Sequence, residues 1–145
     1  MSGAVSKVVV KLKGLKHTYP DDLDILLVGP VGSGGKKVML MSDAGGGGDL
    51  VNVTLTFDDA AATALPNSTQ IVSGTYLPTN YPAPDGSTVD PFVGATAPAA
   101  PYGTILSTFN GTSPNGAWQL FVVDDAALDQ GAMAGGWELI ITTNQ

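Results

Sequence analysis

Three kinds of side chain in this sequence could do chemistry: a serine that ends a Gly-Thr-Ser triplet, a single histidine, and a large set of aspartates. A serine nucleophile needs a base within hydrogen-bonding reach, and that base must itself be held by a carboxylate. Ser113 would be the nucleophile, and His17 is the one histidine that could serve as its base. The triplet is followed by Pro114, Asn115 and Gly116, which are typical turn residues. We therefore interpret Ser113 as a turn residue before a strand and predict no catalytic site.

The aspartates are the stronger candidates for a binding site. They make up 12 of the 13 acidic residues, and Ca²⁺ is bound by about six to eight oxygen ligands, several of which are usually carboxylates. The candidate calcium ligands, which lie where strands are expected to end, are Asp22, Asp24, Asp43, Asp49, Asp124 and Asp129. Aspartate is also common in turns, and the sequence contains no contiguous calcium-binding loop. Calcium ligation and a turn role therefore remain as alternatives for these residues.

A long segment, residues 73–103, carries six of the ten prolines together with several aromatic residues. It is too long for a hairpin loop and too aromatic for a linker, so we predict an ordered loop that lies over the rest of the fold. The candidate ligand-binding residues, which could stack on a sugar or a partner surface, are Tyr76, Tyr81 and Tyr102. Trp118 and Trp137 lie within apolar strands and are predicted to pack in the core.

Short strands are the elements expected to position these residues. Apolar residues occur in short runs, each bounded by Gly, Pro, Asn or Asp, and no convincing helical periodicity is present. The predicted strands are residues 5–12, 23–28, 38–41, 51–57, 105–109, 118–123 and 137–142. This pattern predicts an all-β fold, an antiparallel β-sandwich or jelly roll of about eight strands. Pairing of the second predicted strand with the third would bring Asp22 and Asp24 towards Asp43.

Length, charge and cysteine content narrow the classes of protein. The 145 residues fit one domain, which we place at residues 5–145. Residues 1–4 lack the features of a signal peptide and are interpreted as an artificial start to an excised module. The formal net charge is −7 and arginine is absent, which argues against nucleic acid as a partner. The absence of cysteine excludes disulfides and thiolate metal sites, and no apolar run is long enough for membrane insertion.

The sequence resembles the P domain, also called the P/Homo B domain, in two motifs that occur in the family's order. The first motif is carried by His17-Thr18, Asp22-Leu23, and Pro30 with Gly32, and the second by Asn115-Gly116-Ala117-Trp118-Gln119-Leu120, Asp124, Gly131 and Trp137-Glu138-Leu139. Gly29 stands where the family usually has serine, and the 73–103 segment is longer than in the eukaryotic proprotein convertases and kexins. The chain is therefore more similar to the bacterial secreted members of the family.

The resemblance implies a module without a catalytic site, because the P domain accompanies subtilisin-like proteases and does no proteolysis itself. It predicts an accessory module of a secreted or cell-surface bacterial protein that stabilises or orients neighbouring domains, such as a subtilisin-like protease, with calcium as the stabilising ion suggested by the aspartates. The alternative is an adhesion module that binds carbohydrate or a surface partner through the aromatic loop, residues 76–102. An independent hydrolase is the least supported interpretation, since the sequence has one histidine, one glutamate and no cysteine.

Overall fold

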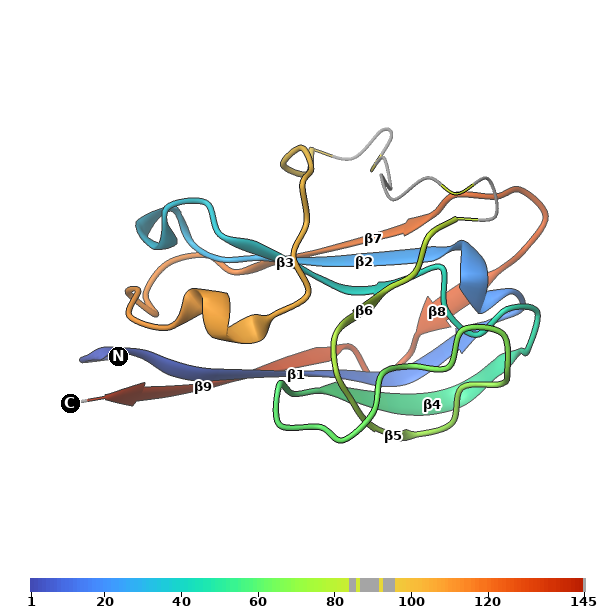
Figure 1. The fold of residues 1–145 in the computed structure, drawn as a ribbon, viewed down its shortest axis with the longest axis horizontal. Coiled ribbons are helices and arrows are strands. Elements are labelled where there is room, and N and C mark those ends of the chain that lie inside the picture. The colour runs from blue at the N-terminus through green and yellow to red at the C-terminus, as the bar shows by residue number, and fades with distance from the viewer. Residues whose placement is uncertain (84–85, 87–91, 93–95, 145) are drawn as a thin grey trace.

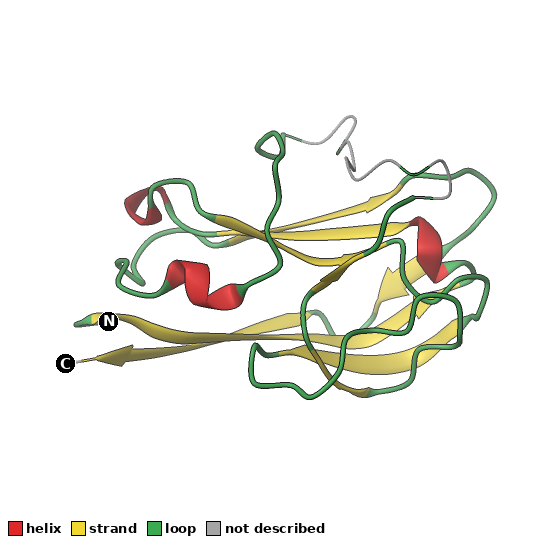
Figure 2. Ribbon diagram, in the orientation of Figure 1, coloured by secondary structure: helices red, strands yellow, loops and turns green. Residues whose placement is uncertain are grey.

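The fold is all β, as predicted from the sequence, and contains nine strands within the residues that the structure describes (Figure 1; Figure 2). The structure is a computed structural model and describes residues 1–83, 86, 92 and 96–144. The strands are β1 (Ala4–His17), β2 (Leu23–Val28), β3 (Lys37–Ser42), β4 (Leu50–Phe57), β5 (Gly74–Tyr76), β6 (Thr79–Asn80), β7 (Gln119–Asp124), β8 (Gly131–Met133) and β9 (Trp137–Asn144). The short 3₁₀ helices are η1 (Pro20–Asp22), η2 (Val31–Ser33) and η3 (Leu106–Phe109). No helix among the described residues has the length and apolar character needed to span a membrane.

Two sheets pack face to face. The first sheet has the order β5-β4-β1, and both β8 and β9 pair with the remaining edge of β1; the second has the order β6-β3-β2-β7. Figure 1 shows β2, β3 and β7 as one layer above β1, β4 and β9. β1 is the central strand, since it pairs antiparallel with β4, β8 and β9. It therefore runs the length of the sandwich and contributes residues to both ends.

The pairing is less uniform than the antiparallel sandwich that the sequence predicts. β3 pairs with β6, and β4 with β5, in parallel, so both sheets are mixed. These two pairs form because the connection after β4, residues 58–73, carries the chain back along the sandwich before it adds β5 and β6 as short edge strands. The predicted sandwich is confirmed as two packed sheets of nine strands, whereas about eight strands in antiparallel pairing were expected. The jelly-roll topology stays a prediction.

The core lies between the sheets. Alternation along β1 places Val10 and Leu12 in it, both fully buried. β2 is buried on both faces, which explains its nearly continuous apolar sequence. The face of β2 and β3 that points away from the first sheet is covered by described residues of the predicted 73–103 loop, because Phe92 and Tyr102 pack there in a separate apolar cluster. The other residues of this loop, 84–85, 87–91 and 93–95, lie outside the described residues.

β1 is longer than predicted because the strand continues through an irregularity. An extra residue lies between Leu12 and Leu15, where Gly14 has a φ of 65°, and a matching irregularity follows on the β4 side. One extra residue shifts the alternation along β1, so that odd-numbered residues face the core after it where even-numbered residues did before it. Leu15 and His17 therefore face the core, and Lys16 faces solvent.

One predicted strand is wrong, because residues 105–109 contain the 3₁₀ helix η3. Its two buried apolar residues, Leu106 and Phe109, are three residues apart, which matches one turn of a 3₁₀ helix. Ile105 is 61% exposed. The carboxylate of Asp59 accepts the backbone N–H groups of the first two residues of η3 at 2.9 and 2.7 Å. The helix therefore closes one end of the core.

Candidate functional site

The corner where β1 and β7 end is organised by His17, whose side chain is 1% exposed. Its Nε2 atom lies 3.1 Å from Oδ2 of Asp124, and its Nδ1 atom lies 2.8 Å from the carbonyl oxygen of Tyr19. A Cβ atom at position 131 would overlap the imidazole, so Gly131 is required for β8 to pair with the end of β1. His17 therefore joins the two sheets, and both ring nitrogens already have partners in the protein.

Four carboxylates surround this corner, and we call Asp22, Asp124, Asp125 and Asp129 the acidic corner. The backbone N–H of Asp125 donates to the carbonyl oxygen of Asp22 at 3.0 Å, and the hydroxyl of Thr18 donates to Asp129 at 2.8 Å. Burial raises the pKa of the Asp22 carboxyl, and the charges of the other three carboxylates raise it further, while the nearby imidazole opposes the shift. The acidic corner is therefore a region of negative potential.

A second pair of aspartates lies between β2 and β3. The predicted approach of Asp24 to Asp43 is confirmed, and the buried hydroxyl of Ser42 lies between them, 2.7 Å from Oδ1 of Asp24 and 3.0 Å from Oδ2 of Asp43. The two aspartates are 2% and 8% exposed. Asp22 does not join this pair, since it belongs to the acidic corner, and Asp49 immediately precedes β4. The candidate calcium ligands are thus divided between separate places.

In the part of the chain that the structure describes, no three His, Asp or Glu side chains are arranged to hold a metal ion. An ion at the acidic corner would have to draw these side chains together, and it would relieve their mutual repulsion. Calcium binding stays a prediction.

A thermal melt in excess EDTA, compared with the same melt in about 1 mM Ca²⁺, tests this prediction. Binding with a Kd of about 10 μM would stabilise the fold by about 2.7 kcal/mol and raise Tm by roughly 5–10 °C. We expect this rise with Ca²⁺ and not with Mg²⁺, which demands a stricter ligand geometry. Asp22→Asn should remove the rise if the acidic corner binds the ion, and Asp43→Asn should remove it if the buried pair does. Coincident melts would leave these aspartates with structural roles alone.

The three tyrosines predicted to stack on a ligand do not meet in one place. Tyr76 ends β5 at the edge of the first sheet, Tyr81 follows β6, and Tyr102 packs edge to face on Phe92 with 5.6 Å between the ring centroids. All three hydroxyls donate to backbone carbonyl groups at 2.7–2.9 Å. The rings of Tyr76 and Tyr81 also pack against the main core. The stacking role stays a prediction.

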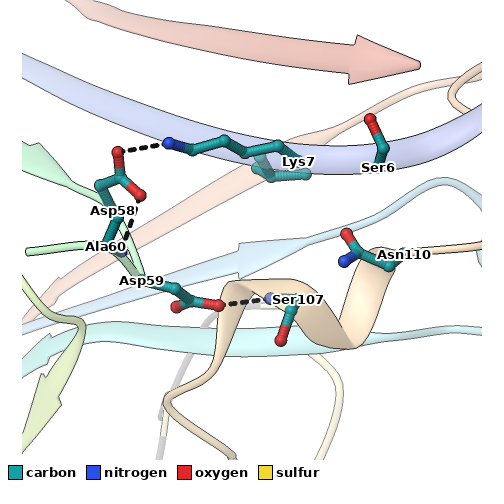
Figure 3. A pocket seen from close by; sticks show the side chains of 8 residues that line it. Ser6, Lys7, Asp58, Asp59, Ala60, Ser107 and Asn110 are labelled. Atoms are coloured by element: carbon teal, nitrogen blue, oxygen red, sulfur yellow. Dashed lines mark hydrogen bonds and ion pairs between the residues drawn. The ribbon is translucent and has the colours of Figure 1, made fainter. Parts of the chain in front are cut away.

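A pocket of about 320 Å³, which is lined mostly by residues with polar side chains, lies beside β1 and η3 (Figure 3). The ammonium of Lys7 donates to Asp58 at 2.8 Å, and Asp58 also accepts the backbone N–H of Ala60 at 2.9 Å. Burial alone would raise the pKa of Asp58, but the hydrogen bonds from Lys7 and Ala60 outweigh it and hold the pKa below its usual value. Figure 3 shows Asp59 turned towards the backbone of η3. The charged groups of this pocket thus have partners within the protein.

This pocket holds the kind of carboxylate pair that a hydrolase would need, but the pair is engaged in structural contacts. A general acid needs a raised pKa, and a general base needs an oxygen free to accept a proton from the substrate or a water. Asp58 has a lowered pKa and an ion pair with Lys7, while Asp59 accepts a backbone N–H at each oxygen. Ser113, which does not line this pocket, accepts the backbone N–H of Asn115 at 3.3 Å, as a turn residue does. The geometry does not favour acid–base chemistry here.

One side of the sandwich is open. β7 forms an edge of the second sheet, β8 and β9 form an edge of the first, and the connection 125–130 joins these two edges. The inward-facing apolar residues along them, which we call the open side, are only partly buried or exposed: Trp118, Leu120, Val122, Met133, Trp137, Leu139 and Ile141. No described residue after Pro114 is buried. At the other edges, by contrast, Leu65 and Ile71 in the connection after β4 are both 1% exposed and close the core.

The open side contains an apolar pocket of about 290 Å³ at the acidic corner. Leu15 and Leu23, both buried, line it together with Met133 and with Val122, which is 46% exposed. Asp124 also lines the pocket. Sequence reasoning missed this pocket, because an inward residue on an edge strand has the same pattern as one in the core.

Comparison of the chain with protein-family models, with curated proteins and with solved structures finds no match. The resemblance to the P domain therefore rests on the two sequence motifs and stays a prediction.

Proposed function

We propose that the chain is a non-catalytic accessory module that resembles the P domain and stabilises or orients a neighbouring domain of a secreted or cell-surface bacterial protein. A subtilisin-like protease is the neighbour that the resemblance suggests, and calcium is the stabilising ion that the aspartates suggest. The observation that carries the proposal is the open side, where apolar residues that would normally belong to a core lie at the surface.

The open side has the properties expected of an interface between domains. Single apolar residues on a surface are ordinary, but contiguous ones beside strand edges are typical of sites of association. Among the described residues, β7 and β9 each have a ladder partner on one edge only. A neighbouring domain packed here would remove this apolar area from water, which stabilises by roughly 25 cal/mol per Å². Interfaces between domains of one chain typically bury about 600–1,500 Å².

The residues that carry the resemblance come together in space, which supports the proposal. His17 and Asp124 belong to different motifs and are 107 positions apart, yet their side chains are hydrogen-bonded. Gly131 packs against the same imidazole. Trp118 and Trp137, also motif residues, both lie on the open side. The two motifs therefore encode one end and one side of the sandwich.

The adhesion alternative has less support from the described residues. Stacking on a sugar uses an accessible aromatic face, usually with polar groups around it that bind hydroxyls. The hydroxyls of Tyr76, Tyr81 and Tyr102 are instead bonded to the backbone, and the rings pack on the protein. Packing of a domain on the open side is thus favoured over binding through the loop.

Thiol labelling of a Val122→Cys variant tests the proposed function. The sequence has no other cysteine, so the reagent reports one position only. We expect fast labelling in the isolated chain, because Val122 is 46% exposed. In the full-length protein to which the module belongs, labelling should slow by roughly tenfold or more, the ratio for an interface closed about nine-tenths of the time.

Val51→Cys is the matched control, because Val51 is 67% exposed and lies on β4, away from β7 and β9 in the sheet order. It should label at similar rates in both proteins. Equal labelling of the Val122→Cys variant in both proteins would show that no domain covers the open side, and the proposed function would fail.

A further inference from the structure

We propose that the apolar pocket at the acidic corner receives an apolar side chain from a protein segment that carries lysine or arginine on both sides of that residue. The inference rests on the proposed function and names the chemistry of the partner at the open side. It follows from the size and lining of the pocket, from the exposure of one of its walls, and from the charge around it.

The pocket is suited to a single apolar side chain. Its volume of about 290 Å³ is just below the range for small-molecule sites, about 300–1,000 Å³. Leu15, Leu23 and Met133 provide an apolar lining. Val122 remains 46% exposed although it is on the inward face of β7. A leucine, methionine or phenylalanine placed here would complete the contacts of Val122 that a covered core would provide.

The charge around the pocket selects a basic segment. The acidic corner places four carboxylates beside the pocket, one of which, Asp124, lines it. Among the described residues that line the pocket, Lys16 is the one lysine. Lys7 and Lys13 are paired elsewhere, with Asp58 and Glu138.

The crowding of the carboxylates points in the same direction. The backbone N–H of Asp125 donates to the carbonyl oxygen of Asp22 at 3.0 Å, and Asp124 directly precedes Asp125, so negative charges lie close together. A cation placed among these carboxylates would offset their repulsion, whereas an acidic segment would add to it. Complementary charge at the rim and an apolar contact in the pocket together describe a basic segment with one apolar anchor.

A peptide titration tests the inference on the isolated chain. The probe is the capped peptide Lys-Lys-Leu-Lys-Lys, titrated in EDTA and low salt so that Ca²⁺ does not compete for the carboxylates, and binding is followed by NMR shifts of the β8 amides. We expect a Kd on the order of 10⁻⁴ M, since a short flexible peptide loses ordering entropy on binding. Replacing leucine by serine, or the lysines by glutamate, should weaken binding by roughly tenfold or more.

Variants of the protein locate the site. Ala132→Trp should abolish peptide binding, because Ala132 is exposed and lines the pocket, so the larger side chain fills it without entering the core. Asp22→Asn with Asp125→Asn should weaken binding about fivefold, from two rim interactions of roughly 0.5 kcal/mol each. Asp21→Asn is the matched control, because Asp21 is adjacent in sequence and its charge does not contribute to the shift at Asp22. It should change binding less than about twofold.

The outcomes separate this inference from the proposed function. Equal binding of the serine peptide, equal binding of the glutamate peptide, or unchanged binding to Ala132→Trp would each overturn the inference. If Val122→Cys is protected in the full-length protein and the peptide does not bind, the module packs through the open side and the basic anchor is wrong. If the peptide binds as expected and Val122→Cys is not protected, the pocket has the inferred chemistry and the proposed function is wrong.

Discussion

Phe109→Ala is expected to destabilise the protein by about 3–5 kcal/mol, the range for removing a fully buried phenylalanine ring. Phe109 is 0% exposed and is the last residue of η3, at the end of the core beside β1. Its ring also packs at 61° against Trp118, with 4.9 Å between the ring centroids, and such aromatic pairs add about 0.5–1.5 kcal/mol. Urea unfolding followed by far-ultraviolet circular dichroism measures the change without relying on tryptophan emission, which the substitution itself would alter.

The control for this prediction is Ile105→Ala, immediately before the same helix. Ile105 is 61% exposed, and substitutions at exposed positions usually change stability by less than about 0.5 kcal/mol. If both variants have the same small effect, η3 does not close the core. A large loss for Phe109→Ala together with a small loss for Ile105→Ala is the expected result.

The second large effect is expected from Ser42→Ala, which should cost about 1.5–3 kcal/mol. The hydroxyl of Ser42 is fully buried and lies within hydrogen-bonding distance of the carboxylates of Asp24 and Asp43. Hydrogen bonds to charged groups contribute more to stability than neutral ones do. Removing a buried donor takes this hydrogen bond from the carboxylate, which stays shielded from water. The same urea titration in EDTA measures the loss.

Ser33→Ala is the matched control, because Ser33 is also buried but its hydroxyl has no hydrogen-bond partner among the described residues. Its replacement should be close to neutral. If Ser33→Ala and Ser42→Ala lose the same stability, the loss comes from the change in volume, and the bonds to the carboxylates contribute nothing. Recovery of Ser42→Ala on addition of Ca²⁺ would show that Asp24 and Asp43 can bind the ion, because a cation would then take the place of the donated proton.

The strands could be predicted where the pattern of apolar residues and the bounding turns agree. β2 and β3 have nearly continuous apolar sequences because both faces are covered, and their antiparallel pairing brings Asp24 to Asp43 as expected. The same reasoning placed Asp22 with this pair. That placement was wrong because η1 precedes β2 and the Asp22 side chain joins the acidic corner instead.

The remaining features depend on contacts that are distant in sequence. Residues 105–109 are as apolar as a strand, and only the hydrogen bonds from η3 to Asp59 and the burial of Leu106 and Phe109 distinguish the helix. β8 is three residues long and contains glycine and alanine, which have low strand propensity. It forms because β1 offers an edge beside His17. The open side could not be predicted either, since it depends on which strands lie at the sheet edges.

The irregularity at Gly14 acts as a change of phase in a repeat of two residues. Before it, the even-numbered residues Val8, Val10 and Leu12 face the core, and after it the odd-numbered residues Leu15 and His17 do. If the same residues paired in a regular ladder without the bulge, Gly14 and Lys16 would face the core instead, and the ammonium of Lys16 would point towards Asp124 in place of the imidazole. The backbone conformation at this one irregularity therefore sets which charge faces the pocket, so a shift in strand register here would change the preferred partner without replacing any residue of the pocket itself.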